Sequence, residues 1–303
     1  MKLQFGTGSR FGRLNSSLAS RLVEYALSKG ITSFDTGFNY GEGSSQPLLA
    51  SCLKSHIREN REGLTISSKS GTLLKSQSGF KCFNTDYIDH TIFTSVRLFG
   101  DTYLDTYYLH GPTSKDLSSP ELVSCLEAHK SSGLIKSIGV NTHDYPLMMQ
   151  IADGDFDYIT SVMIDYNLIQ QDRSEVIDLL VRRGISVVAG TALCQGLLLQ
   201  SPLSLFLRSR SFFYLCRLLF KPSSRRFVAP CRTARKILRD RYPQHAFSIP
   251  LGFLLSDDRI SSIPVGMLSH ASIDANIYAS SVEWDPAFMA MVAQDVRENI
   301  NSF

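Results

Sequence analysis

Four polar residues of this chain could together move a proton near neutral pH: Asp35, Tyr40, Lys69 and His110. A free tyrosine is a weak acid with a pKa near 10, and each unit by which that pKa is lowered costs about 1.4 kcal/mol, which an adjacent ammonium can supply. Lys69 suits that part, and Asp35 would keep a buried lysine charged. His110 could donate a hydrogen bond to a substrate oxygen. The set suits protonation of a carbonyl oxygen during hydride transfer.

These residues need a scaffold that brings distant segments together. Apolar or β-rich runs predict eight strands, and between most of them the spacing of apolar residues predicts helices, several followed by a glycine (Gly30, Gly100, Gly133 and Gly184). The strands are expected at 3–7, 31–36, 64–69, 104–110, 135–141, 159–164, 185–190 and 260–265, and the helices at 16–29, 44–59, 86–99, 120–132, 144–152 and 174–183.

Alternating strands and helices indicate parallel strands joined by right-handed crossovers. Eight such units favour an α/β fold of the (β/α)8 TIM barrel type, a parallel eight-stranded barrel, as a single domain over residues 1–303. Each of the four candidates lies at the C-terminal end of a predicted strand or just after it. That end of a barrel carries its catalytic groups.

Composition agrees with one large core, because 43% of the 303 residues are hydrophobic. The six cysteines form no CxxC pair and no zinc-finger spacing, so we expect reduced thiols and no metal site. Neither a signal peptide nor a run of 18 apolar residues is found, and a cytoplasmic protein is expected.

One segment departs from the barrel pattern. Residues 201–241 hold eleven Lys and Arg residues against the single acid Asp240, and 201–231 is too long and apolar for an ordinary connection. We expect an insertion there, an added basic and aromatic helix after strand seven. Its predicted basic face holds Arg210, Arg217 and Lys221, and its apolar surface includes Phe206, Phe213 and Leu219.

Three roles for this insertion stay open. A lid over the substrate is favoured because long loops at this end of a barrel shape specificity. Contact with an anionic membrane surface or a protein through 203–229 is the alternative. No nucleic-acid partner is expected, because local positive charge without a binding module is non-specific.

Several sequence motifs resemble the signature segments of the aldo-keto reductase family: DTGFNYGEG, ISSKSG, TYLDTYYLHGP and IKSIGVN. The resemblance continues through LQFGTG, YNLIQQ, VVAGTALCQGLL and SSIPVGMLSHASIDAN, and so covers nearly the whole chain outside 201–231. It implies an NAD(P)H-dependent oxidoreductase that reduces an aldehyde, ketone or sugar-like carbonyl, or oxidises the corresponding alcohol or lactol. In the family the four residues form a catalytic tetrad with Tyr40 as the acid.

The resemblance also implies the cofactor contacts. These are Thr7, Asp35, Asn141, Thr191, Leu193, Gln195, Gly266, Met267 and Asn276. The chain differs from the family where Asn141 and Thr142 replace a Ser-Asn pair, where Met163 replaces a glutamine, and where Gly190 stands in place of an aromatic residue that stacks on the nicotinamide.

The choice between NADPH and NADH is open at this stage. Val265 to Asn276, including Leu268, holds no Lys or Arg for an adenosine 2′-phosphate. NADPH is expected if arginines of the basic segment, such as Arg225, Arg226, Arg232 or Arg235, bind that phosphate; NADH is the alternative. The glycines at 6, 8 and 12 miss the GxGxxG spacing of a Rossmann fold.

A second class of function is a catalytically weak nucleotide-sensing or scaffold subunit, because several cofactor-binding motifs differ from those of the family. The intact set of four polar residues favours the enzyme, since a purely structural demand does not explain their convergence on one barrel face. The substrate and the oligomeric state are left open by the sequence.

Overall fold

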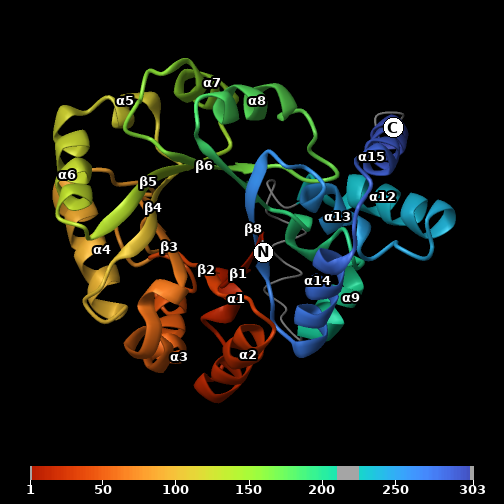
Figure 1. Cartoon of the computed structure of the whole chain (residues 1–303), viewed down its shortest axis with the longest axis horizontal. Helices are drawn as coiled ribbons and strands as arrows, with labels where there is room; N and C mark the ends of the chain where they lie inside the picture. Colours follow the sequence, from red (N-terminus) through yellow and green to blue (C-terminus); the bar gives the residue numbers. More distant parts are fainter. Residues whose placement is uncertain (1, 210–224, 301–303) are drawn as a thin grey trace.

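The strands close into a parallel barrel with helices outside it (Figure 1). The computed structural model describes residues 2–209 and 225–300, and the side chains only outside 206–209. Each strand pairs with the next one along the chain, and the first pairs with the last. The strands are β1 (Leu3–Gly6), β2 (Ser33–Asp35), β3 (Thr65–Ser70), β4 (Leu104–His110), β5 (Ile135–Thr142), β6 (Ser161–Asp165), β7 (Ser186–Gly190) and β8 (Ile260–Gly266). The predicted eight-stranded α/β barrel is confirmed.

The helices between the strands lie close to their predicted positions. These are α2 (Ser16–Ser28), α3 (Ser45–Asn60), α4 (Thr85–Leu98), α6 (Pro120–Ser131), α7 (Tyr145–Asp153) and α8 (Ser174–Arg182). Other helices were not predicted. These are the short α1 (Gly8–Phe11) and α5 (Ser114–Leu117), and the later α12 (Val228–Arg241), α13 (Ile249–Leu255), α14 (His270–Ser281) and α15 (Pro286–Ile300). The four glycines expected to follow helices all have positive φ, between 74° and 81°.

The alternation of side chains along β4 separates the barrel interior from the helix layer. Tyr107 points outward, and its hydroxyl is 2.7 Å from that of Thr91 on α4. Tyr108 points inward, and its hydroxyl is 2.9 Å from that of Ser161 on β6. Because side chains repeat every second residue, His110 lies on the same inner face as Tyr108.

The inner face forms a small hydrophobic cluster of its own, made by Tyr108, Met163 and Val188. Gly139 pairs with Tyr108 in the sheet register and leaves room for its ring. A Cβ atom at Gly139 would overlap the Tyr108 ring. The absence of a side chain at residue 139 therefore makes room for the aromatic ring beneath Lys69.

The expected insertion begins with α9 (Pro202–Ser209), and α12 lies after it. The predicted basic face of Arg210, Arg217 and Lys221 and the apolar surface at Phe206, Phe213 and Leu219 lie outside the described residues or side chains. The added helix and its role therefore remain predictions. None of the helices that the structure describes is both long and apolar enough to cross a membrane.

Gly139→Ala is expected to lower the free energy of unfolding by about 1–3 kcal/mol, because the added methyl group overpacks the barrel interior. Urea unfolding of the chain measures this. Gly266→Ala is the control, since a Cβ there meets nothing within 4 Å. Equal stability of the two variants would contradict the packing argument.

Candidate active site

A buried ion pair between β2 and β3 lies at the C-terminal end of the barrel. The Lys69 side chain is fully buried, and its Nζ is 2.7 and 2.8 Å from the two carboxylate oxygens of Asp35. The same Nζ donates to the Thr36 carbonyl at 2.8 Å, so all three ammonium N–H groups have acceptors. Ser67 donates to Asp35 Oδ1 at 2.9 Å. Both partners of the ion pair are thus held by further hydrogen bonds.

The charge of Lys69 depends on its neighbours. Burial acts most strongly and opposes the charged form, but Asp35, Tyr40 and Tyr108 together raise the pKa of Lys69 above its ordinary value. Lys69 is therefore an ammonium at neutral pH, as the sequence analysis expects.

Tyr40 lies over this ion pair in the turn after β2. The Lys69 Nζ is 5.0 Å from the centroid of the Tyr40 ring. Gly37 makes the approach feasible, because a Cβ at that residue would lie 2.9 Å from Lys69 Cγ and 3.3 Å from the Tyr40 ring. The His110 ring meets the Tyr40 ring edge to face, with centroids 6.3 Å apart and planes at 87°. The structure thus brings all four predicted residues together.

His110 ends β4 with a buried Nδ1 atom that has no hydrogen-bond partner among the described residues. Burial, followed by the charges of Lys81, Lys69 and His143, lowers the pKa of His110 to about 3. The imidazole is therefore neutral at physiological pH and carries one N–H donor.

Lys81 is a neighbour of His110 that the sequence did not predict. Its loop folds back after β3, with Thr72 and Lys81 forming an antiparallel bridge. Lys81 Nζ donates to the His110 carbonyl and, at 2.7 Å, to Thr72 Oγ1. Burial lowers the pKa of Lys81 to about 8. No local motif marks this lysine, because its contact with β4 depends on how the loop folds.

Several residues expected at the cofactor lie around the same end of the barrel. Thr7 is buried and donates to the Thr36 hydroxyl at 3.0 Å. Asn141 pairs in register with His110, and its amide is 2.8 Å from Met163 Sδ. Thr191, Leu193 and Gln195 follow β7, Gly266 ends β8 with the buried Met267 directly after it, and Asn276 lies on α14.

A second charged cluster at this end was not predicted. Asp165 ends β6, is buried, and pairs in register with Gly190. Its carboxylate is 2.9 Å from His143 Nδ1, 3.5 Å from an Arg226 nitrogen and 2.5 Å from Thr191 Oγ1. Burial opposes its charge, but His143, Thr191 and Arg226 lower the pKa of Asp165. Arg226, from the basic segment, therefore reaches the end of β6.

One buried amide among these residues fits a bound nicotinamide cofactor. Asn276 is 4% exposed, and its Nδ2 atom has no hydrogen-bond partner among the described residues. A buried amide donor without an acceptor is costly, and a ligand acceptor would satisfy it. Asn276 lies on the helix after β8, where the sequence analysis places a cofactor contact.

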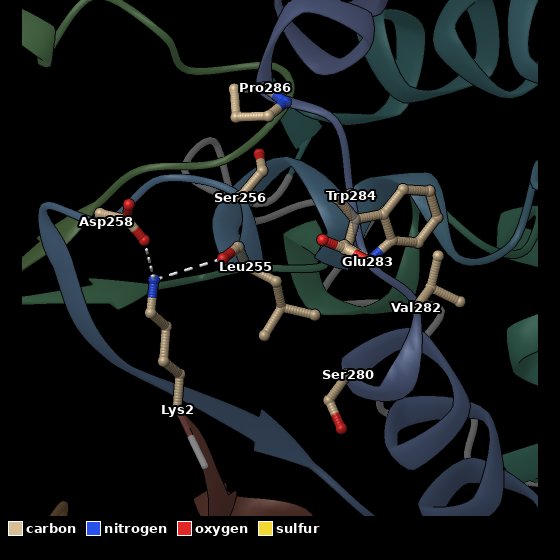
Figure 2. Close-up of a pocket in the computed structure, with 9 residues that line it drawn as sticks. All are labelled: Lys2, Leu255, Ser256, Asp258, Ser280, Val282, Glu283, Trp284 and Pro286. Carbon is tan, nitrogen blue, oxygen red and sulfur yellow. Dashed lines mark hydrogen bonds and ion pairs between the residues drawn. The ribbon is translucent and has the colours of Figure 1, made fainter.

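A hollow of about 470 Å³ lies at the opposite, N-terminal end of the barrel (Figure 2). Lys2 reaches across it to the Leu255 carbonyl at 3.2 Å and to Asp258 at 3.6 Å, and Trp284 lies on its far side. None of the four candidate residues lines this hollow. The candidate active site and this hollow therefore lie at opposite ends of the barrel.

A family model that matches nearly the whole sequence shows which family this chain belongs to. The model of the Aldo/keto reductase family matches residues 2–296. The chain belongs to the aldo/keto reductase family. Family membership and the oxidoreductase names of its relatives make this aldo/keto reductase an oxidoreductase, and the family implies a nicotinamide cofactor.

Relatives of this aldo/keto reductase are distant in sequence. It is 22% identical to the L-glyceraldehyde 3-phosphate reductase of Escherichia coli (strain K12), over 98% of this chain and 89% of that protein. It is 25% identical to the L-galactose dehydrogenase of Arabidopsis thaliana, over 90% of this chain and 81% of that protein. The solved aldo-keto reductase AKR11C1 from Bacillus halodurans (holo form) superposes with a TM-score of 0.77 at 21% identity, over 98% of this chain and 92% of that one. The structural likeness supports the barrel fold.

Acid is expected to destabilise the protein through His110. Its folded pKa of about 3 lies below its ordinary value of 6.5, so between these values the unfolded chain binds more protons and stability falls as pH falls. From pH 7 to pH 5 the wild type should lose about 1–2 kcal/mol more unfolding free energy than His110→Asn.

Urea unfolding at the two pH values measures this difference. His270→Asn, which replaces an exposed histidine, is the control and should behave as the wild type. An equal loss in the wild type and His110→Asn would contradict a neutral, buried His110.

Proposed function

We propose that this chain is an NAD(P)H-dependent oxidoreductase that reduces an aldehyde, ketone or sugar-like carbonyl, or oxidises the corresponding alcohol or lactol. The observation that carries the proposal is the buried Asp35–Lys69 ion pair beside Tyr40 and His110. The names of two relatives, an L-glyceraldehyde 3-phosphate reductase and an L-galactose dehydrogenase, support small sugar-type substrates.

When bound, the nicotinamide supplies or accepts the hydride. Reduction leaves negative charge on the carbonyl oxygen, and the Tyr40 hydroxyl donates the proton. The Lys69 ammonium favours the phenolate that remains, and Asp35 keeps Lys69 charged and in place. His110, neutral because its pKa is low, donates a hydrogen bond to the substrate oxygen without giving up its proton. In oxidation the Tyr40 oxygen takes the proton back.

We propose NADPH as the preferred cofactor, with NADH as the alternative. The four candidate arginines differ in their partners. Arg226 is paired with Asp165, and Arg235 is buried and donates to the Leu197 carbonyl. Arg225 and Arg232 are exposed. Arg225 and Arg232 are the better candidates for the 2′-phosphate, because Arg226 would first have to leave Asp165 and Arg235 would have to leave the Leu197 carbonyl.

Tyr40→Phe is expected to lower kcat by roughly 10²–10⁴-fold, because the variant lacks the proton donor. Steady-state reduction of DL-glyceraldehyde with NADPH measures this, and a titration followed by NADPH fluorescence should give a dissociation constant close to that of the wild type. The cofactor signal is preferable to Trp284 emission, because Trp284 lies at the other end of the barrel. Unchanged turnover would exclude Tyr40 as the acid.

Replacing Arg225 and Arg232 together by Ala should raise KM for NADPH about tenfold and leave KM for NADH unchanged, since only NADPH carries the 2′-phosphate. Arg182→Ala, on the remote α8, is the control for general loss of positive charge. A wild-type KM for NADPH well above that for NADH would overturn the preference itself.

A further inference from the structure

Three metal-ligating side chains meet on the outside of the barrel, away from the four residues described above. Asp89 lies on α4, and Cys125 and His129 lie on α6. One ligand atom from each residue lies within 4.8 Å of the other two. Helices α4 and α6 are neighbours in the outer ring (Figure 1). The three donors therefore come from two adjacent helices.

The spacing along α6 explains why two of these donors share a site. Cys125 and His129 are four residues apart, so they lie on one face of the helix, one turn from each other. Asp89 faces them from α4, and its Oδ1 is 2.9 Å from His129 Nε2. A ligand set divided between two helices shows neither CxxC nor zinc-finger spacing, so the sequence alone did not predict it.

We propose that Asp89, Cys125 and His129 bind a divalent transition-metal ion, with Zn²⁺ as the best match. A carboxylate, a thiolate and an imidazole are all ligands that Zn²⁺ accepts, whereas Mg²⁺ and Ca²⁺ require oxygen donors. Three protein ligands leave a fourth position of a tetrahedral ion for water.

Distances and charge agree with this assignment. Ligand atoms at about 2.0–2.3 Å from zinc at tetrahedral angles lie about 3.3–3.7 Å apart. The Asp89–His129 pair, at 2.9 Å, must therefore open, and the Cys125 sulfur, which lies within 4.8 Å of both partners, must move in by no more than about 1 Å. A carboxylate and a thiolate neutralise the two charges of the ion. The ion must displace the thiol proton of Cys125 as it binds, because the thiolate and not the thiol is the metal ligand.

The surroundings allow an ion to enter and then hold it. His129 is 6% exposed and packs edge to face against Phe93, with ring centroids 5.2 Å apart, which fixes the imidazole. The Asp89 side chain is 47% exposed, so the cluster is open to solvent on its side. The bound ion would tie α4 to α6, the helices that follow the strands carrying Lys69 and His110.

The experiment is a titration of the chelator-treated full chain with Co²⁺, which reports a thiolate ligand through a near-ultraviolet charge-transfer band and tetrahedral geometry through visible d–d bands. We expect one Co²⁺ per chain, displacement by Zn²⁺, and a rise in Tm with Zn²⁺ of at least about 3 °C. Absence of the charge-transfer band in the wild type would overturn the proposal.

Cys125→Ser should remove the charge-transfer band, while Cys52→Ser, a buried cysteine on α3, should keep it. Equal bands in Cys125→Ser and the wild type would place the thiolate elsewhere and overturn the proposal. Asp89→Asn changes a half-exposed side chain with little risk to folding, and it should weaken Co²⁺ binding at least tenfold. Unchanged affinity in Asp89→Asn would also contradict the site.

Discussion

The buried ion pair between Lys69 and Asp35 is the constraint on which the candidate active site depends. A fully buried ammonium is unfavourable unless it is paired, and removing one partner of such a pair typically costs 3–5 kcal/mol. Here the carboxylate, the Thr36 carbonyl and the hydroxyl of Ser67 complete the pairing. The charge that results is held beside the Tyr40 ring, where it can favour a phenolate. A structure that only needed stability could have filled this place with an apolar side chain.

The barrel supplies what the ion pair needs. Parallel strands bring the C-terminal ends of β2, β3 and β4 together, and the two-residue repeat points Lys69 and His110 to the same interior. Glycine at residues 37 and 139 leaves space for Tyr40 and Tyr108 around the lysine. The same end of the barrel holds Asp165 with His143 and Arg226, so the basic segment is tied to the site by charge.

The strands and the four central residues could be predicted because their signals are local: β-rich runs, glycines after helices, and polar residues at strand ends. Contacts that depend on tertiary folding could not. Lys81 reaches His110 only because its loop folds back after β3, and Asp89 meets Cys125 and His129 only because α4 and α6 are neighbours. Helix α13 was missed because six of its seven residues are buried, so its sequence lacks the polar face that reveals a helical period.

Lys69 is charged while fully buried because the Asp35 carboxylate is paired with it. The most direct measurement is a ¹⁵N NMR titration of the Lys69 side-chain nitrogen, assigned by comparison with Lys69→Met. This nitrogen is expected to keep the chemical shift of an ammonium from about pH 6 to about pH 10, since its pKa lies above the ordinary value of 10.5. A transition to the neutral amine near pH 8 would contradict it, and the phenolate of Tyr40 would then lack its supporting charge.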